Sequence, residues 1–163
     1  MYGFPTVRAA QSKRMGAVKR ALASEDARAE WVDAMAHLIG KQQWFRWHDS
    51  GDVFSLEYLE MIVDVVKATP ATRHWLPTRE LLTVRRYQRK HGAFPGNLTV
   101  RLSLPKVDAS TGDADKVRES FGLPTSTVST TDPTCPARTQ GNECRDCRAC
   151  WDGAVANVSY AKH

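Results

Sequence analysis

Apolar residues follow two different periods along the middle of this chain. One set recurs every three or four positions, as expected for the buried face of a helix: Leu59, Ile62, Val63 and Val66. Another set alternates with polar residues, as expected for a strand with two unlike faces: Leu98, Val100 and Leu102. The sequence therefore predicts a protein that contains both helices and strands.

From residue 43 onward these two patterns take turns along the chain. The predicted strands are 44–48, 73–76, 98–104, 126–130 and 154–160. The helices expected between them are 55–70, 79–91 and 113–121, and Ser55 is expected to cap the first of these. Pro77 is expected to end the second strand, and Thr78 to cap the helix that follows it. A strand followed by a helix and another strand is a βα unit, whose crossover makes neighbouring strands parallel.

This repeat predicts an α/β fold, either a partial TIM-like barrel or an open parallel sheet of 4-5 strands. The chain is too short for the eight βα units of a full barrel. Residues 1–42 predict two helices that pack on the core, a basic one over 5–23 and a second one capped by Ser24. Residues 43–132 are the βα-repeat core, and residues 133–163 are a cysteine-rich, metal-binding segment with the last strand.

All the cysteines of the protein lie in one short stretch, spaced C-x8-C-x2-C-x2-C: Cys135, Cys144, Cys147 and Cys150. Thiols scattered by chance do not gather in this way, so the stretch predicts an iron–sulfur cluster, a structural zinc or a pair of disulfides. No apolar run is long enough to span a membrane, and the N-terminus has no signal peptide. We therefore expect a cytoplasmic protein with no membrane partner, where reducing conditions disfavour disulfides.

The spacing of the cysteines bears on the choice of metal. A tetrahedral zinc site usually takes two C-x2-C pairs separated by a longer loop. Three cysteines in a C-x2-C-x2-C run instead resemble the ferredoxin pattern for a [4Fe–4S] cluster, with Cys135 as the fourth ligand. Nearby arginines at 138, 145 and 148 would offset the negative charge of a cluster, and Trp151 would shield it. We expect a [4Fe–4S] cluster with zinc as the alternative, and for either metal a purely structural role that holds the segment together stays open.

Polar residues gather where the predicted strands end, which is where ligands bind in parallel α/β folds. The residues expected to form a ligand pocket there are Arg46, His48, Asp49, Asp52, Arg79, Glu80, Arg101 and Ser103. If Phe45 and Trp47 pack under helices, alternation turns Arg46 and His48 to the other face, as it does Arg101. Two arginines on one face of a parallel sheet suggest a small anionic ligand.

Two alternatives to this pocket remain open. The two arginines can instead pair with Asp49, Asp52 or Glu80 in a structural ion network. His48 with Asp49 or Asp52 can also form an acid–base pair, although such a sequence is common after a strand. The sequence therefore assigns no catalytic residue.

The net charge of +5 permits contact with nucleic acid without requiring it. A nucleic-acid surface would use the basic helix over 5–23 and four residues of the helix over 79–91: Arg85, Arg86, Arg89 and Lys90. No base-reading motif accompanies these charges, so such binding would be non-specific and sensitive to salt. A zinc-stabilised, basic nucleic-acid-binding protein is the alternative to an iron–sulfur βα protein.

Four motifs in this chain resemble a known family: FRWHDSGDVFS, WLPTRE, RLSLP and CRDCRACW. Together they resemble the phage gene product 88 family over most of the chain. The resemblance implies a protein of a phage-infected or prophage-carrying bacterial cell. It implies no particular reaction, because the biochemical function of that family is unassigned.

The order of βα units followed by cysteines also resembles, in architecture alone, a reduced radical S-adenosylmethionine barrel enzyme. That resemblance implies an iron–sulfur enzyme that uses S-adenosylmethionine. Members of the gene product 88 family carry further cysteines upstream of the segment that matches 1–5, whereas this chain has none before Cys135. We therefore expect either a naturally short version or a truncated relative, inactive as that kind of enzyme if the upstream cysteines are required.

Overall fold

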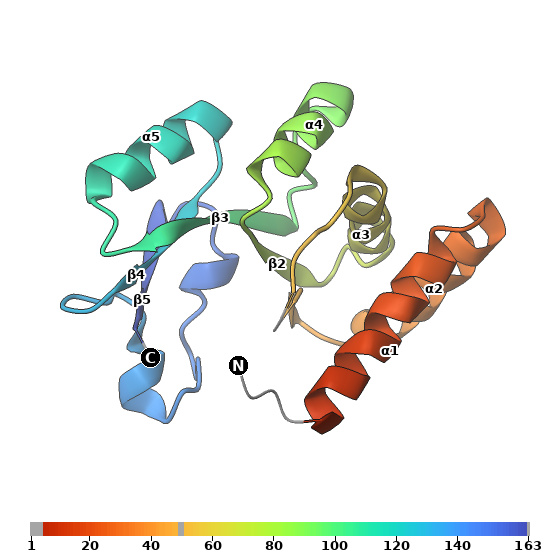
Figure 1. The fold of residues 1–163 in the computed structure, drawn as a ribbon, viewed down its shortest axis with the longest axis horizontal. Coiled ribbons are helices and arrows are strands. Elements are labelled where there is room, and N and C mark those ends of the chain that lie inside the picture. The colour runs from red at the N-terminus through yellow and green to blue at the C-terminus, as the bar shows by residue number, and fades with distance from the viewer. Residues whose placement is uncertain (1–4, 49–50, 163) are drawn as a thin grey trace.

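Five parallel strands form one curled sheet in the computed structural model, with helices along its outer face (Figure 1). The strands follow one another across the sheet in sequence order: β1 (Trp44–Arg46), β2 (Arg73–Thr78), β3 (Leu98–Val107), β4 (Thr125–Ser129) and β5 (Asn157–Ala161). The structure describes residues 5–48 and 51–162. A curled parallel sheet in this order is half of a TIM-like barrel, which confirms the predicted α/β fold class.

Five helices and two short 3-10 turns accompany the sheet in the described part of the chain. They are α1 (Pro5–Ala21), α2 (Glu25–Ile39), α3 (Leu56–Ala68), α4 (Leu81–His91), α5 (Thr111–Phe121), η1 (Pro136–Gln140) and η2 (Ala149–Trp151). The hydroxyls of Ser24 and Ser55 accept hydrogen bonds from the first turns of α2 and α3. Both caps were predicted from the sequence, because a serine before an acidic first turn satisfies a free backbone N–H.

The prediction for Pro77 and Thr78 was wrong, since β2 continues through both residues. The carbonyl of Trp75 accepts from the backbone N–H of Trp47 at 2.8 Å, so alternate residues of β2 point their backbone groups toward β1. Strand β1 ends at Arg46, and the missing N–H of Pro77 therefore removes no bond from the ladder. Helix α4 begins later than predicted, at Leu81, with no side-chain cap.

The main hydrophobic core lies on the outer, convex face of the sheet. Leu76 of β2 and Val100 of β3 pack there with Leu59 and Ile62 of α3, and none of them is more than 1% exposed. Phe45 of β1 belongs to the same core. These contacts confirm the alternation predicted for the first and third strands, in which every second residue faces the helices.

The inner, concave face carries the other half of each strand. The register pairs Arg46 with Trp75, Pro77 with Arg101, and Ser126 with Val158, so these residues share that face. Helices α3, α4 and α5 make the first three crossovers on the convex side, whereas the connection from β4 to β5 lies over the concave side (Figure 1). This connection, residues 130–156, contains every cysteine of the protein.

Candidate metal centre

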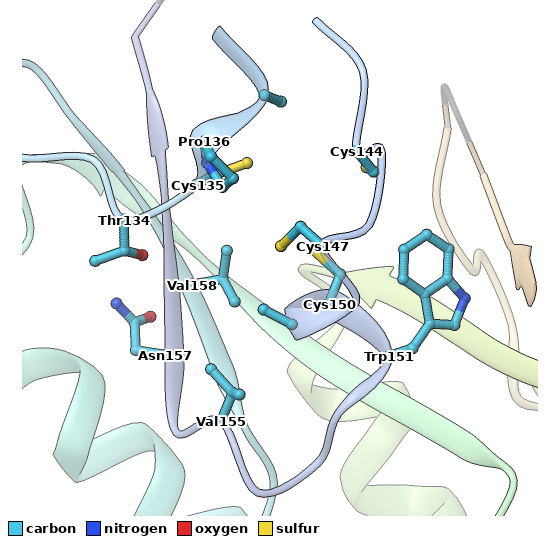
Figure 2. A pocket seen from close by; sticks show the side chains of 12 residues that line it. Thr134, Cys135, Pro136, Cys144, Cys147, Cys150, Trp151, Val155, Asn157 and Val158 are labelled. Carbon is cyan, nitrogen blue, oxygen red and sulfur yellow. The ribbon is translucent and has the colours of Figure 1, made fainter. Parts of the chain in front are cut away.

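One pocket on the concave side is lined by all four predicted metal ligands: Cys135, Cys144, Cys147 and Cys150. Its volume is about 360 Å³, and most of the remaining wall is apolar, including Val155 and Val158. Figure 2 shows Cys135 and Cys144 on opposite sides of the opening, with the other two cysteines between them. None of the four thiols is in a disulfide.

The edge of β5 holds Cys135 in place. Its backbone N–H donates to the carbonyl of Ser159 at 2.8 Å, and the backbone N–H of Ser159 donates to the hydroxyl of Thr134 at 2.9 Å. In a parallel strand the backbone groups of successive residues point alternately to the two neighbouring sides. The backbone N–H and carbonyl of Ser159 point away from β4, toward the open edge of the sheet. The start of the connection therefore covers the open edge of the sheet while it presents Cys135 to the pocket.

A tight turn brings Cys144 and Cys147 to the pocket. The backbone N–H of Cys147 donates to the carbonyl of Cys144 at 2.8 Å, and Arg145 between them has a positive φ of 43°. The guanidinium of Arg148 donates to the carbonyls of Arg145 and Cys147, which closes the turn from outside. Cys144 is exposed and Cys147 half-buried, so this turn forms the solvent side of the site.

Cys150 lies at the inner side of the pocket, in η2, and is only 6% exposed. Its Sγ is 3.2 Å from the hydroxyl of Tyr160 on β5. Burial raises the pKa of the Cys150 thiol, and the hydrogen bond from Tyr160 and the charge of Arg101 oppose that effect. Burial likewise raises the pKa of Tyr160, which therefore keeps its proton and can donate to the sulfur. Tyr160 was not among the residues predicted for the site.

Arg101 fixes the connection to the sheet from within. Its side chain is fully buried and donates to four main-chain carbonyls, those of Thr125, Ala149, Asp152 and Val155, over 2.8–3.1 Å. It makes no ion pair within the part of the chain that the structure describes. The sequence placed Arg101 in a ligand pocket or an ion network, and the structure places it under the cysteine segment instead.

Aromatic side chains join the connection to β1 and β2. The indole N–H of Trp151 donates to the carbonyl of Phe45 at 2.9 Å, and its ring lies edge-on to the rings of Trp44 and Trp75. The guanidinium of Arg46 lies 4.7 Å above the ring of Trp75, on the concave face as alternation predicted. Trp151 lines the pocket beside the cysteines, in the position expected of a shield.

The other predicted pocket residues lie apart from the cysteines. Asp52 accepts hydrogen bonds from the hydroxyl of Thr78 at 2.5 Å and from the backbone N–H of Arg79 at 2.8 Å. The side chains of Arg79 and Glu80 are exposed, and the hydroxyl of Ser103 bonds to Ser126 at 2.9 Å. Asp52 therefore ties its loop to the end of β2, and none of these predicted residues lines the cysteine pocket.

His48 does not follow the face predicted for it. Its Nε2 is 2.9 Å from the hydroxyl of Tyr58 on α3, on the convex side of the sheet, whereas Arg46 faces the concave side. The reason is a positive φ of 52° at His48, which interrupts the alternation of the strand. Of its two predicted partners, Asp52 bonds to Thr78 and Arg79, and Asp49 lies outside the described residues.

The spread of the four thiols bears on which metal group they suit. Among the residues of 5–48 and 51–162, no three His, Cys, Asp or Glu side chains are close enough to hold one metal ion. A single zinc ion draws its sulfurs to about 2.3 Å from the metal, so its ligands converge on one point. A [4Fe–4S] cluster spreads four thiolates over the corners of a cube. A set of four soft sulfur donors suits zinc and an iron–sulfur cluster alike, and the pocket of about 360 Å³ leaves space for the larger group.

Two of the four α4 residues predicted for a nucleic-acid surface contact other side chains. Arg85 lies 3.9 Å above the ring of Phe121 and donates to Ser120, while Lys90 pairs with Glu60 at 2.8 Å. The side chains of Arg86 and Arg89 are exposed on α4, as are the five basic residues of α1. No helix in the described part of the chain is long and apolar enough to cross a membrane.

Comparison with known proteins gives one match. A family model described as gene product 88 matches residues 1–153, which include α1 to η2 and all four cysteines. No curated protein and no solved structure matches the chain. The matched range ends before β5, so Tyr160 lies beyond it.

Proposed function

The chain belongs to the gene product 88 family, and we propose that it is an electron-transfer protein whose four cysteines hold a [4Fe–4S] cluster. The family match confirms the resemblance that the four sequence motifs indicated. The observation that carries the proposal is that Cys135, Cys144, Cys147 and Cys150 converge on one pocket from three separate stretches of the β4–β5 connection. The crossover between two parallel strands is usually a helix. Here it is an irregular segment, and this segment carries the thiols.

The wall of the pocket supports a cluster. Its apolar lining excludes water from the sulfurs on the inner side, where Cys150 is buried. Four thiols complete the ligand set of such a cluster, which then supplies one-electron transfer and leaves no open position for a substrate. The exposed Cys144 brings the other side of the site to the surface, where an electron can pass to or from a partner.

The complete ligand set also separates this proposal from the alternatives. A radical S-adenosylmethionine-like reaction requires an open coordination position, which four cysteines around one pocket do not leave. A zinc-stabilised nucleic-acid-binding protein requires a compact metal site and a free basic surface. Arg85 and Lys90 of the predicted surface contact other residues, whereas Arg86, Arg89 and the basic residues of α1 are exposed, so the metal that the cysteines hold decides between the two proposals.

The proposal is tested by metal analysis of protein purified without oxygen. We expect equal amounts of iron and acid-labile sulfide, at four of each per chain, with broad absorption in the visible range. Replacing any one cysteine by serine is expected to lower the iron content sharply. Thr139→Ser is the matched control, because Thr139 belongs to the same connection and does not line the pocket. One zinc per chain, or no metal, would contradict the proposal.

A further inference from the structure

We infer that Arg101 is the positioning residue of the cysteine site, and that its buried positive charge raises the reduction potential of the group bound there. This inference rests on the proposed function, because it concerns an anionic cluster at the four thiols. It goes further because it gives two roles to one residue outside the ligand set. Arg101 holds the backbone of the site in place, and it contributes a positive charge.

The positioning role follows from the acceptors of Arg101. One terminal nitrogen donates to the carbonyls of Ala149 and Asp152, at 2.9 Å and 3.0 Å, on either side of Cys150. The other donates to Thr125 of β4 and to Val155, where the connection turns into β5. A planar guanidinium can hold four acceptors in one fixed arrangement, whereas the three donors of a lysine cannot.

Arg101 forms no ion pair with an acidic side chain in the described part of the chain. Burying a cation is unfavourable unless its donors are satisfied and a negative group lies near. The four carbonyls satisfy the terminal nitrogens, but the buried Nε has no acceptor among the described residues. Burial lowers the pKa of Arg101, and the groups that oppose this effect are Tyr160, Cys150 and Asp152. A permanent cation thus lies beside the innermost thiol of the pocket.

An anionic occupant of the pocket would complete this arrangement. A cluster with four thiolate ligands is negatively charged, and one-electron reduction adds a further negative charge beside the guanidinium. A nearby buried cation stabilises the reduced form more than the oxidised form, because charges interact strongly where water is excluded. Removing the cation should therefore make the site harder to reduce.

A second arginine on the same face provides a matched control. The guanidinium of Arg46 lies on the ring of Trp75, and its side chain is exposed to solvent. Water and salt screen exposed charges, so the loss of Arg46 should change the potential little. The contrast between Arg101 and Arg46 therefore separates a buried charge from the general charge of the concave face.

The experiment has two measurements. The first is a redox titration of the intact, cluster-containing protein with dithionite as the electron donor, followed by electron paramagnetic resonance. The second is hydrogen–deuterium exchange of the metal-free protein over residues 149–155. Four proteins are compared: wild type, Arg101→Met, Arg101→Lys and Arg46→Met. Arg101→Gln, which has no charge, replaces Arg101→Met if that variant does not fold.

We expect Arg101→Met to shift the midpoint potential to a more negative value and to speed exchange over 149–155. Arg101→Lys should keep most of the potential but exchange faster than wild type, and Arg46→Met should resemble wild type in both measurements. An unchanged potential and unchanged exchange in Arg101→Met would overturn the inference. If the wild type holds no reducible cluster, the proposed function fails and the charge role with it, while the exchange measurement still decides the positioning role.

Discussion

The two faces of the half-barrel are covered in different ways. On the convex face, apolar side chains from α3 and the strands are almost fully buried, including Leu59, Ile62 and Leu76. On the concave face the buried apolar residues that pack together are Trp75, Cys150 and Val158, and a fully buried arginine bonds to the chain above them. The convex face is thus held by packing, whereas the concave face is held by specific polar bonds.

The difference separates the face that stabilises the sheet from the face that carries the cysteines. Close packing of many apolar groups contributes strongly to stability, and it suits a face that only has to hold the sheet together. The concave cover has no helix longer than the 3-10 turns η1 and η2, so its shape depends on a few specific bonds. We expect changes on the convex face to unfold the protein, and changes on the concave face to act locally.

The largest expected effect comes from the convex core. Leu76→Ala should lower the free energy of unfolding by about 2 to 5 kcal/mol, because Leu76 is fully buried and its loss leaves a cavity. Urea denaturation followed by circular dichroism measures the change. Leu82→Ala is the control, since Leu82 on α4 is 76% exposed, and it should change the stability by less than about 0.5 kcal/mol. Equal effects of the two variants would show that the convex core is not where the structure places it.

Acid should also destabilise the convex side, through His74. Burial lowers the pKa of His74 from 6.5 to about 4, an effect that its bond to Thr69 partly opposes. Between these two pH values the unfolded chain binds more protons than the folded one, so stability falls as the pH falls through this window. The loss should reach about 3 kcal/mol. His74→Phe should flatten this part of the pH profile, and a profile that keeps its slope would assign the loss to other groups.

A smaller and local effect is expected on the concave face. Trp151→Phe removes the indole N–H that donates to the carbonyl of Phe45. The loss of one such bond should lower stability by about 1 kcal/mol. Hydrogen–deuterium exchange should speed up in the connection 130–156 and stay unchanged in α3. Faster exchange throughout the sheet would contradict the separation of the two faces.

The smallest effect is expected at the surface of the convex side. Glu60 on α3 accepts bonds from Lys90 at 2.8 Å and from His91 at 2.6 Å, at the end of α4. Although burial raises the pKa of Glu60, these two partners lower it more, so the group keeps its charge at neutral pH. Since both partners are partly exposed, Glu60→Gln should lower stability by at most about 1 kcal/mol, and less in high salt. A loss as large as that of Leu76→Ala would contradict this ranking.

The convex face was predictable from the sequence because it depends on local alternation. Val100 and Leu102 face the helices as their period requires, and Ser24 and Ser55 cap the helices that follow them. The clustering of the cysteines was predicted from their spacing. The position of Arg101 on the opposite face of β3 was predicted from the alternation of that strand.

The cover of the concave face was not predictable in the same way. Arg101 bonds to residues between 24 and 54 positions further along the chain, and no local pattern encodes such contacts. The positive φ of His48 likewise leaves no trace in an alternating sequence, so its face was predicted wrongly. Tyr160 lies in a predicted strand, but only the fold shows that its hydroxyl reaches Cys150.

The central claim is that the four thiols on the concave face hold one [4Fe–4S] cluster. Native mass spectrometry of the folded protein, purified without oxygen, tests it most directly because it weighs the protein together with whatever it binds. We predict one main species that carries the added mass of four iron and four sulfide, and its loss when Cys150 is replaced by serine. A species with a single zinc ion, or one lighter by the hydrogens lost in two disulfides, would contradict the account.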